Sequence, residues 1–230
     1  MGAPKNLVHG NMTTARFLES LLELPYETSL IFKTPTLFEV WKGGRNQCPY
    51  LSAYKTMPYV VGHTHPSAPA GQHSPPSPQD LVNCLESTVP HLVFAREGTW
   101  VFTPGEELAQ EWRETPDQEG LEAVLRNNLT GLLFEYVGLP VAKKLGHEEF
   151  VRKVAVAVPR KDPQKPPLGF SLRLDPLAFP PALPPLSTDA TTVDREPHLW
   201  SVDEDPAAVL HALEAAAEGT CVTSDGSVVV

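Results

Sequence analysis

The chain has 230 residues, a net charge of −10 and 25 prolines. This length is enough for one domain with a hydrophobic core, with or without a small second module. The acidic balance argues against nucleic acid as a partner, since such binding depends on basic side chains that neutralise phosphates, and the absence of any run of about 20 apolar residues argues against a membrane-spanning helix.

The first half of the chain is predicted to alternate between helices and strands. Residues 13–24 carry apolar side chains at helical spacing and stop at Pro25, which predicts an amphipathic helix. Ser77 followed by Pro78 is typical of a helix start, because serine caps helices and proline suits the first turn. The expected strands are 26–33, 36–42, 59–62, 91–95 and 99–102, in which the first two and the last two form hairpins.

The second half is predicted to begin with two helices, at 106–114 and 119–137, and to end with a helix at 205–217. Strands are expected at 151–158 and 168–174. A proline-rich stretch at 174–186 predicts an extended segment, and a terminal hairpin is expected across Asp225-Gly226. We therefore expect one α/β domain over 1–140 and a proline-rich extension or small module over 141–230.

The most informative motif is a pair of histidines that follows a short apolar strand. The chain reads Gly62-His63-Thr64-His65-Pro66 and, after a proline-rich spacer, Ser77-Pro78-Gln79-Asp80. Histidines two residues apart on a strand point to the same side, and an aspartate in the first turn of the next helix can supply an oxygen. Two nitrogens and one carboxylate leave a fourth position for water, which is the pattern of catalytic zinc.

This motif resembles the signature of the JAMM (MPN+) metalloproteases, His-x-His-Pro followed by Ser-x-x-Asp. The resemblance implies a cytidine-deaminase-like α/β fold, a mixed sheet flanked by helices, with zinc (Zn²⁺) bound by His63, His65 and Asp80. It also implies that Ser77 stabilises the tetrahedral intermediate. The spacer before Ser77 is longer than in the family, and it contains His73, which is either an alternative ligand or an exposed loop histidine.

The resemblance also implies a glutamate as general base, and two residues are candidates. Glu27 precedes a predicted strand after the first helix, as the family base does, although the family's glycine is absent from the following residues. Glu39 lies in an otherwise apolar strand, where an unpaired carboxylate is costly to bury. We prefer Glu27 and keep Glu39 as the alternative.

The predicted function is therefore hydrolysis of an amide or isopeptide bond by a zinc metallo-isopeptidase. By resemblance, the substrate is a conjugate of ubiquitin or a ubiquitin-like protein. Two alternatives stay open: a catalytically silent MPN-type interaction module, and a zinc hydrolase of short peptides or small molecules. The first residues show no secretion signal, and three scattered cysteines show no disulfide or zinc-knuckle spacing, so we expect a cytoplasmic protein.

Overall fold

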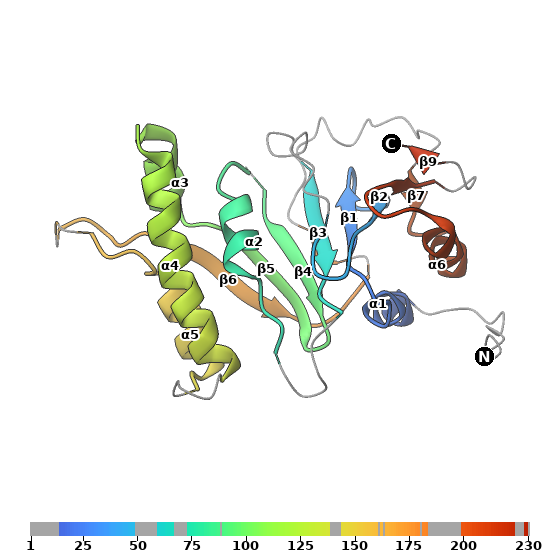
Figure 1. The fold of residues 1–230 in the computed structure, drawn as a ribbon, viewed down its shortest axis with the longest axis horizontal. Coiled ribbons are helices and arrows are strands. Elements are labelled where there is room, and N and C mark those ends of the chain that lie inside the picture. Colours follow the sequence, from blue (N-terminus) through green and yellow to red (C-terminus); the bar gives the residue numbers. More distant parts are fainter. Residues whose placement is uncertain are drawn as a thin grey trace.

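The structure is a computed structural model. It describes residues 14–48, 59–66, 73–87, 89–138, 144–160, 162, 164–179, 181–183, 199–223 and 228–229. In these ranges the chain forms an open, mixed sheet of nine strands that is flanked by helices (Figure 1). The predicted class, an α/β fold with a mixed sheet between helices, is confirmed.

The strands follow the spatial order β6-β5-β4-β3-β1-β2-β8-β9, and β7 pairs with β2 beside this path. Only β3 and β4 run parallel among the described pairs. The strands are β1 Thr28–Phe32, β2 Leu37–Lys42, β3 Val60–Thr64, β4 His91–Ala95, β5 Gly98–Pro104, β6 Phe170–Asp175, β7 Trp200–Ser201, β8 Cys221–Val222 and β9 Val228–Val229. The helices are α1 Thr14–Leu22, α2 Pro78–Asn83, α3 Glu106–Glu114, α4 Gln118–Val137, α5 His147–Val154 and α6 Pro206–Ala215.

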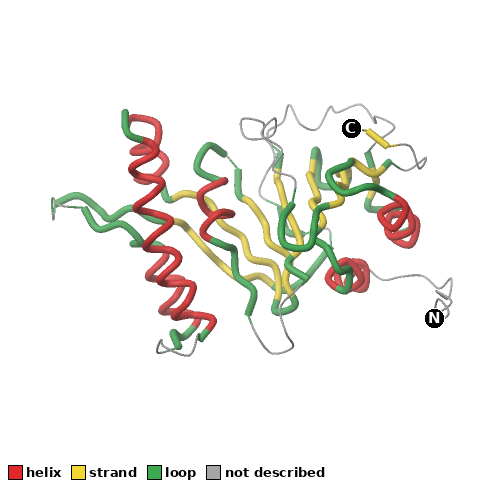
Figure 2. Tube along the Cα trace, in the orientation of Figure 1, coloured by secondary structure: helices red, strands yellow, loops and turns green. Residues whose placement is uncertain are grey.

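The sheet separates two hydrophobic cores, because neighbouring residues of a strand point to opposite faces. In β4, Val93 packs with residues of α2, α3, α4 and α5, whereas Leu92 and Phe94 pack with residues of α1 and α6. Figure 2 shows the strands in yellow between these two groups of helices. The helices thus cover opposite faces, and β4 and β5 contribute side chains to both cores.

The crossover from β3 through α2 to β4 determines where the histidine motif lies. Parallel neighbours need such a crossover, and its helix begins near the carboxyl end of β3. Gly62 allows β3 and β4 to pack closely, because a Cβ atom there would lie 2.7 Å from the ring of Phe94. The two histidines at the end of β3 are consequently brought to the start of α2.

One predicted element is wrong. Residues 151–158 were predicted as a strand, but His147–Val154 form helix α5. Phe150 and Val154 are both buried and are four residues apart, so the helical period dominates over the alternation of a strand. Only Val158 takes part in a β-bridge, with Leu168.

The region predicted as a separate extension contributes strands to the same sheet as the first 140 residues. Strand β6 pairs with β5, and both β7 and β8 pair with β2. The proline-rich stretch follows β6, and Phe179 within it is buried against Phe17 and Phe38. In the described parts of the chain, none of the helices has the length and apolar composition that crossing a membrane requires.

Candidate metal centre

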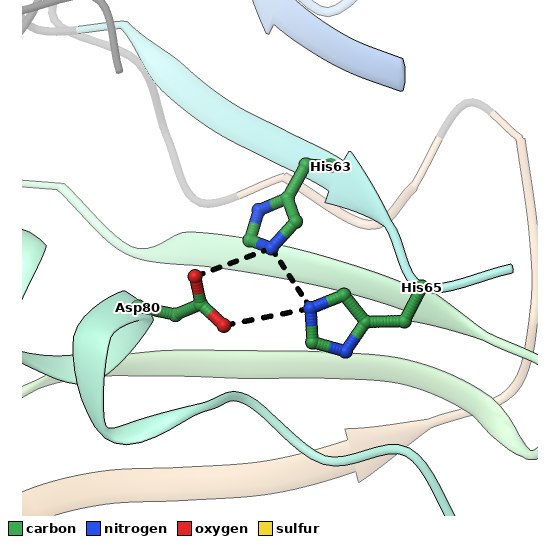
Figure 3. A group of neighbouring side chains, drawn as sticks. All are labelled: His63, His65 and Asp80. Atoms are coloured by element: carbon green, nitrogen blue, oxygen red, sulfur yellow. Dashed lines mark hydrogen bonds and ion pairs between the residues drawn. The ribbon is translucent and has the colours of Figure 1, made fainter. Parts of the chain in front are cut away.

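The structure brings together the three side chains that the sequence proposed as metal ligands. His63 lies in β3, His65 follows the strand, and Asp80 lies in the first turn of α2 (Figure 3). The two Nε2 atoms are 3.1 Å apart. Asp80 Oδ1 lies 3.4 Å from His63 Nε2, and Oδ2 lies 3.4 Å from His65 Nε2. Each side chain is mostly buried, with 14–16% of its surface exposed.

These separations fit a tetrahedral ion. Zinc binds imidazole nitrogen and carboxylate oxygen at about 2.0–2.1 Å, so neighbouring ligand atoms of a tetrahedral site lie about 3.3–3.4 Å apart. The Nε2–Nε2 separation, and the separation of each Asp80 oxygen from its nearer imidazole, are within about 0.3 Å of that value. The three donor atoms all lie within 4.8 Å of one another and can hold a metal ion. The set is two nitrogens and one carboxylate, which leaves a fourth position for a non-protein ligand.

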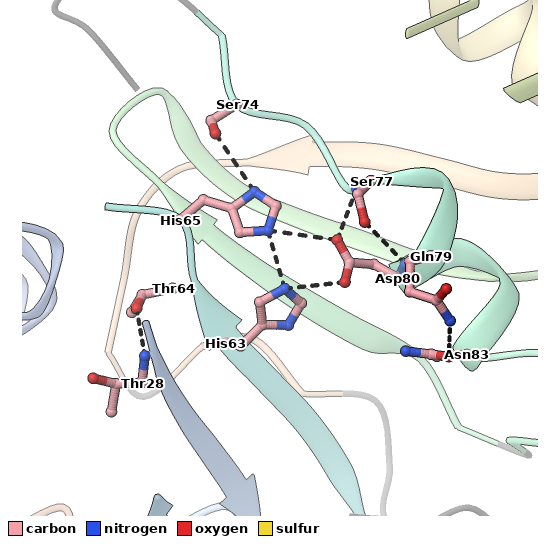
Figure 4. A network of polar contacts seen from close by, with 9 residues as sticks. All are labelled: Thr28, His63, Thr64, His65, Ser74, Ser77, Gln79, Asp80 and Asn83. Atoms are coloured by element: carbon pink, nitrogen blue, oxygen red, sulfur yellow. Dashed lines mark hydrogen bonds and ion pairs between the residues drawn. The ribbon is translucent and has the colours of Figure 1, made fainter. Parts of the chain in front are cut away.

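Asp80 is held in place by the helix that it begins. Ser77 is the N-cap of α2: its Oγ accepts a hydrogen bond from Asp80 N at 3.1 Å, and Asp80 Oδ2 accepts one from Ser77 N at 2.7 Å (Figure 4). This reciprocal pair is a capping box. The Ser77 hydroxyl uses only an acceptor lone pair in the cap, so its O–H can still donate to another group.

The charges of the ligand candidates affect the pKa values of Asp80 and His63. Burial opposes the ionisation of Asp80, but the two imidazoles outweigh it and hold the pKa of Asp80 well below its usual value. Burial also lowers the pKa of His63, yet the charge and hydrogen bond of Asp80 outweigh this effect and leave the pKa of His63 raised. The carboxylate is therefore ionised and ready to bind a cation.

Glu27 lies beside the ligand candidates, at the entrance to β1. Its backbone N–H donates to Gly44 O at 2.8 Å, and its carbonyl accepts from Gly43 N at 2.9 Å, which continues the β1–β2 pairing. The next residue is tied to the histidine motif, because Thr28 N donates to Thr64 Oγ1 at 2.9 Å. Antiparallel pairing of β1 with β3 places Ser29 opposite His63, so Glu27, two residues earlier, lies on the same face as His63.

The Glu27 side chain is buried, with 9% exposure of the residue. Burial raises the pKa of Glu27; the neighbouring imidazoles of His63 and His65 lower it, and Asp80 raises it. The thiol of Cys48 is hydrogen-bonded to Glu27 and is itself kept neutral, because burial raises its pKa well above the usual value. Glu27 thus has the metal-ligand candidates among its electrostatic neighbours.

Glu39, the alternative base, has a different environment. Its Oε1 forms an ion pair with Lys33 Nζ at 3.0 Å, and its Oε2 accepts a hydrogen bond from Trp41 Nε1 at 3.0 Å. The residue is 2% exposed. An unpaired carboxylate would be costly to bury in this strand, and the lysine and the indole offset that cost for Glu39.

The sequence did not predict the positions of three residues near the site. Cys48 lies against Glu27, as described above. Ser74, in the spacer, places its Oγ 3.5 Å from His65 Nδ1 (Figure 4), and Glu97 accepts a hydrogen bond from Ser74 N. His73 is not among the grouped ligands; it packs against the ring of Tyr136 with a centroid distance of 5.2 Å. These contacts join different segments of the chain, so no local sequence pattern predicts them.

No model of a known family, no curated protein and no solved structure matches this chain.

Proposed function

We propose that this protein is a zinc-dependent metallo-isopeptidase of the JAMM type. The observation that carries the proposal is the convergence of His63, His65 and Asp80 at separations that match a tetrahedral ion. The buried carboxylate of Glu27 beside these residues supports a hydrolytic role, since a purely structural metal site has no use for a base. The proposal includes the family fold, which the open mixed sheet accommodates.

When bound, zinc supplies activation of water near neutral pH and polarisation of a carbonyl. The protein contributes orientation and proton transfer. Asp80 is fixed by the Ser77 cap, His63 is part of β3, and the backbone N–H of His65 donates to Phe94 O at 2.8 Å. Glu27 takes the proton from the attacking water with its carboxylate and delivers it to the nitrogen of the leaving amine, which balances the hydrolysis.

Ser77 has a second role in this proposal. Its O–H, which the helix cap leaves available, donates a hydrogen bond to the oxygen that becomes negative as the carbonyl is attacked. A preorganised donor of this kind stabilises developing charge because it needs no rearrangement during the reaction. The same residue therefore caps α2 and lies close to the reacting carbonyl.

The substrate class is proposed from the motif. In the family that the motif resembles, the scissile bond joins ubiquitin or a ubiquitin-like protein to a lysine side chain. We propose the same class here, in a protein that acts in the cytoplasm.

The first experiment measures zinc binding by the purified protein with a chromophoric competitor, together with zinc content by elemental analysis. We expect one zinc per chain, and we expect His63→Ala and Asp80→Asn to lose it. Removal of a ligand must cost more than the roughly 10–100-fold that loss of an outer-shell partner costs. A folded wild-type protein with no measurable zinc affinity would favour the silent interaction module and end the enzyme proposal.

A further inference from the structure

The segment that leads into α2, residues 73–77, is anchored at Glu97, in the turn between β4 and β5. The Glu97 carboxylate accepts hydrogen bonds from the backbone N–H of Ser74 at 2.5 Å and from Trp100 Nε1 at 3.0 Å. Its side chain is 12% exposed. Trp100 is completely buried in the core beneath α4 and α5. The anchor is thus tied through Trp100 to the buried strand β5.

Ser74 links Glu97 to His65, one of the metal-ligand candidates. Its Oγ lies 3.5 Å from His65 Nδ1, slightly beyond the roughly 2.7–3.2 Å of a strong N–H···O hydrogen bond, so a small adjustment of either side chain forms the bond. The other nitrogen of the ring, Nε2, faces His63 and Asp80. A neutral imidazole carries one proton, so a proton on Nδ1 that is donated to Ser74 leaves the Nε2 lone pair available to a metal.

The anchor also sets the start of α2. Two buried prolines, Pro75 and Pro76, connect Ser74 directly to the cap residue Ser77. Proline restricts the φ angle to a narrow range, so this connection is stiff. One carboxylate therefore fixes a segment that touches His65 at one end and carries the cap of Asp80 at the other.

We propose that Glu97 and Ser74 are positioning residues for the metal centre. Glu97 fixes Ser74, and Ser74 holds His65 in the tautomer and orientation that present Nε2 to the ion. The inference rests on the zinc site of the proposed function and extends it to the long spacer. It explains how this spacer can end in a well-placed ligand set. Outer-shell partners of metal-bound histidines act in this way.

The test measures zinc affinity by competition for Ser74→Ala and Ser74→Thr, with Ser171→Ala as the matched control. Ser171 is exposed on β6, so its hydroxyl has no role in the centre. We expect Ser74→Ala to bind zinc roughly 10–100-fold more weakly than the wild type. Ser74→Thr keeps a hydroxyl and is expected to restore most of the affinity, and Ser171→Ala is expected to match the wild type.

A parallel pair of variants tests the anchor. Glu97→Ala removes the acceptor for Ser74 N–H and Trp100 Nε1, and we expect a loss of zinc affinity similar to that of Ser74→Ala. Glu97→Gln retains an acceptor oxygen and is expected to bind zinc nearly as well as the wild type. Thermal unfolding of every variant shows which of them fold.

A second readout uses the zinc-free protein labelled with [¹⁵N]histidine. Long-range ¹H–¹⁵N spectra report which ring nitrogen of His65 carries the proton. Asp80 favours a proton on Nε2 and Ser74 favours one on Nδ1, so we expect a larger Nδ1–H fraction in the wild type and in Ser74→Thr than in Ser74→Ala. A purely structural role for Ser74 would leave the tautomer unchanged.

The outcomes separate this inference from the proposed function. If the wild type binds no zinc, the proposed function fails, and the inference that depends on it fails too. If the wild type binds zinc through His63 but Ser74→Ala has the affinity and the tautomer of Ser171→Ala, the positioning role is overturned and the proposed function stands.

Discussion

Two buried glutamates on neighbouring strands have opposite surroundings. Glu39, in β2, is neutralised by Lys33 and hydrogen-bonded to Trp41. Glu27, just before β1, lies among two imidazoles, a carboxylate and a thiol, and no lysine or arginine of the described segments forms an ion pair with it. Both side chains are nearly inaccessible to solvent.

The difference shows how burial alone fails to identify a catalytic acid or base. A buried carboxylate is expensive unless it is paired, and the cation beside Glu39 offsets that cost within the fold. No lysine or arginine of the described segments pairs with Glu27, and burial raises its pKa. A carboxylate in that condition is suited to accepting and returning a proton.

The largest expected effect comes from removing the carboxylate of Glu27. Glu27→Gln is nearly isosteric and cannot move a proton, so we expect kcat to fall by roughly 10²–10⁴-fold. Zinc affinity is expected to stay at the wild-type level, since Glu27 is not among the grouped ligands. Steady-state cleavage of a ubiquitin conjugate, with zinc content measured on the same samples, tests this. Full activity of Glu27→Gln would transfer the role to Glu39.

The matched substitution Glu39→Gln is expected to affect stability and leave catalysis intact. It removes the negative charge that pairs with the buried Lys33, and loss of one partner of a buried pair lowers the free energy of unfolding by at most about 3–5 kcal/mol. Chemical denaturation measures this loss, and kcat of the folded fraction should equal that of the wild type. A catalytic defect with unchanged stability would mean that Glu39, like Glu27, acts in catalysis.

Ser77 offers a smaller test, because it combines a cap with a proposed donor. Ser77→Ala is expected to cost about 1 kcal/mol of stability as a lost N-cap. It should also reduce kcat by roughly 10²-fold or more as a lost oxyanion donor. Ser77→Gly is the control, since glycine caps helices almost as well. Equal loss of kcat in both variants assigns catalysis to the hydroxyl, whereas retained activity in Ser77→Gly makes Ser77 a cap only.

The parts of the molecule that the sequence predicted well are those with a local cause. Ser77 followed by Pro78 predicted the start of α2, because capping and the restricted φ angle of proline act within one turn. The histidine pair at the end of β3 required only the two-residue period of a strand. The convergence of these two pieces followed from the crossover that joins parallel strands β3 and β4 through α2.

The parts that the sequence missed depend on distant partners. Lys33, which forms the ion pair with Glu39, follows β1, and its position beside Glu39 depends on how β1 pairs with β2. Glu97 is 23 positions away from Ser74. Strand β7 has only two residues and exists because β2 pairs with it. In α5, tertiary packing selected a helical pair, Phe150 and Val154.

The most direct test of the central claim is reconstitution of isopeptide cleavage. The protein is stripped with a chelator, and cleavage of a panel of diubiquitins and short peptides is measured as zinc is added back. We predict no activity without metal, recovery at one zinc per chain, and no recovery in His63→Ala. Cleavage that persists in the stripped protein, or a fully zinc-loaded wild type that cleaves none of these substrates, would contradict the account.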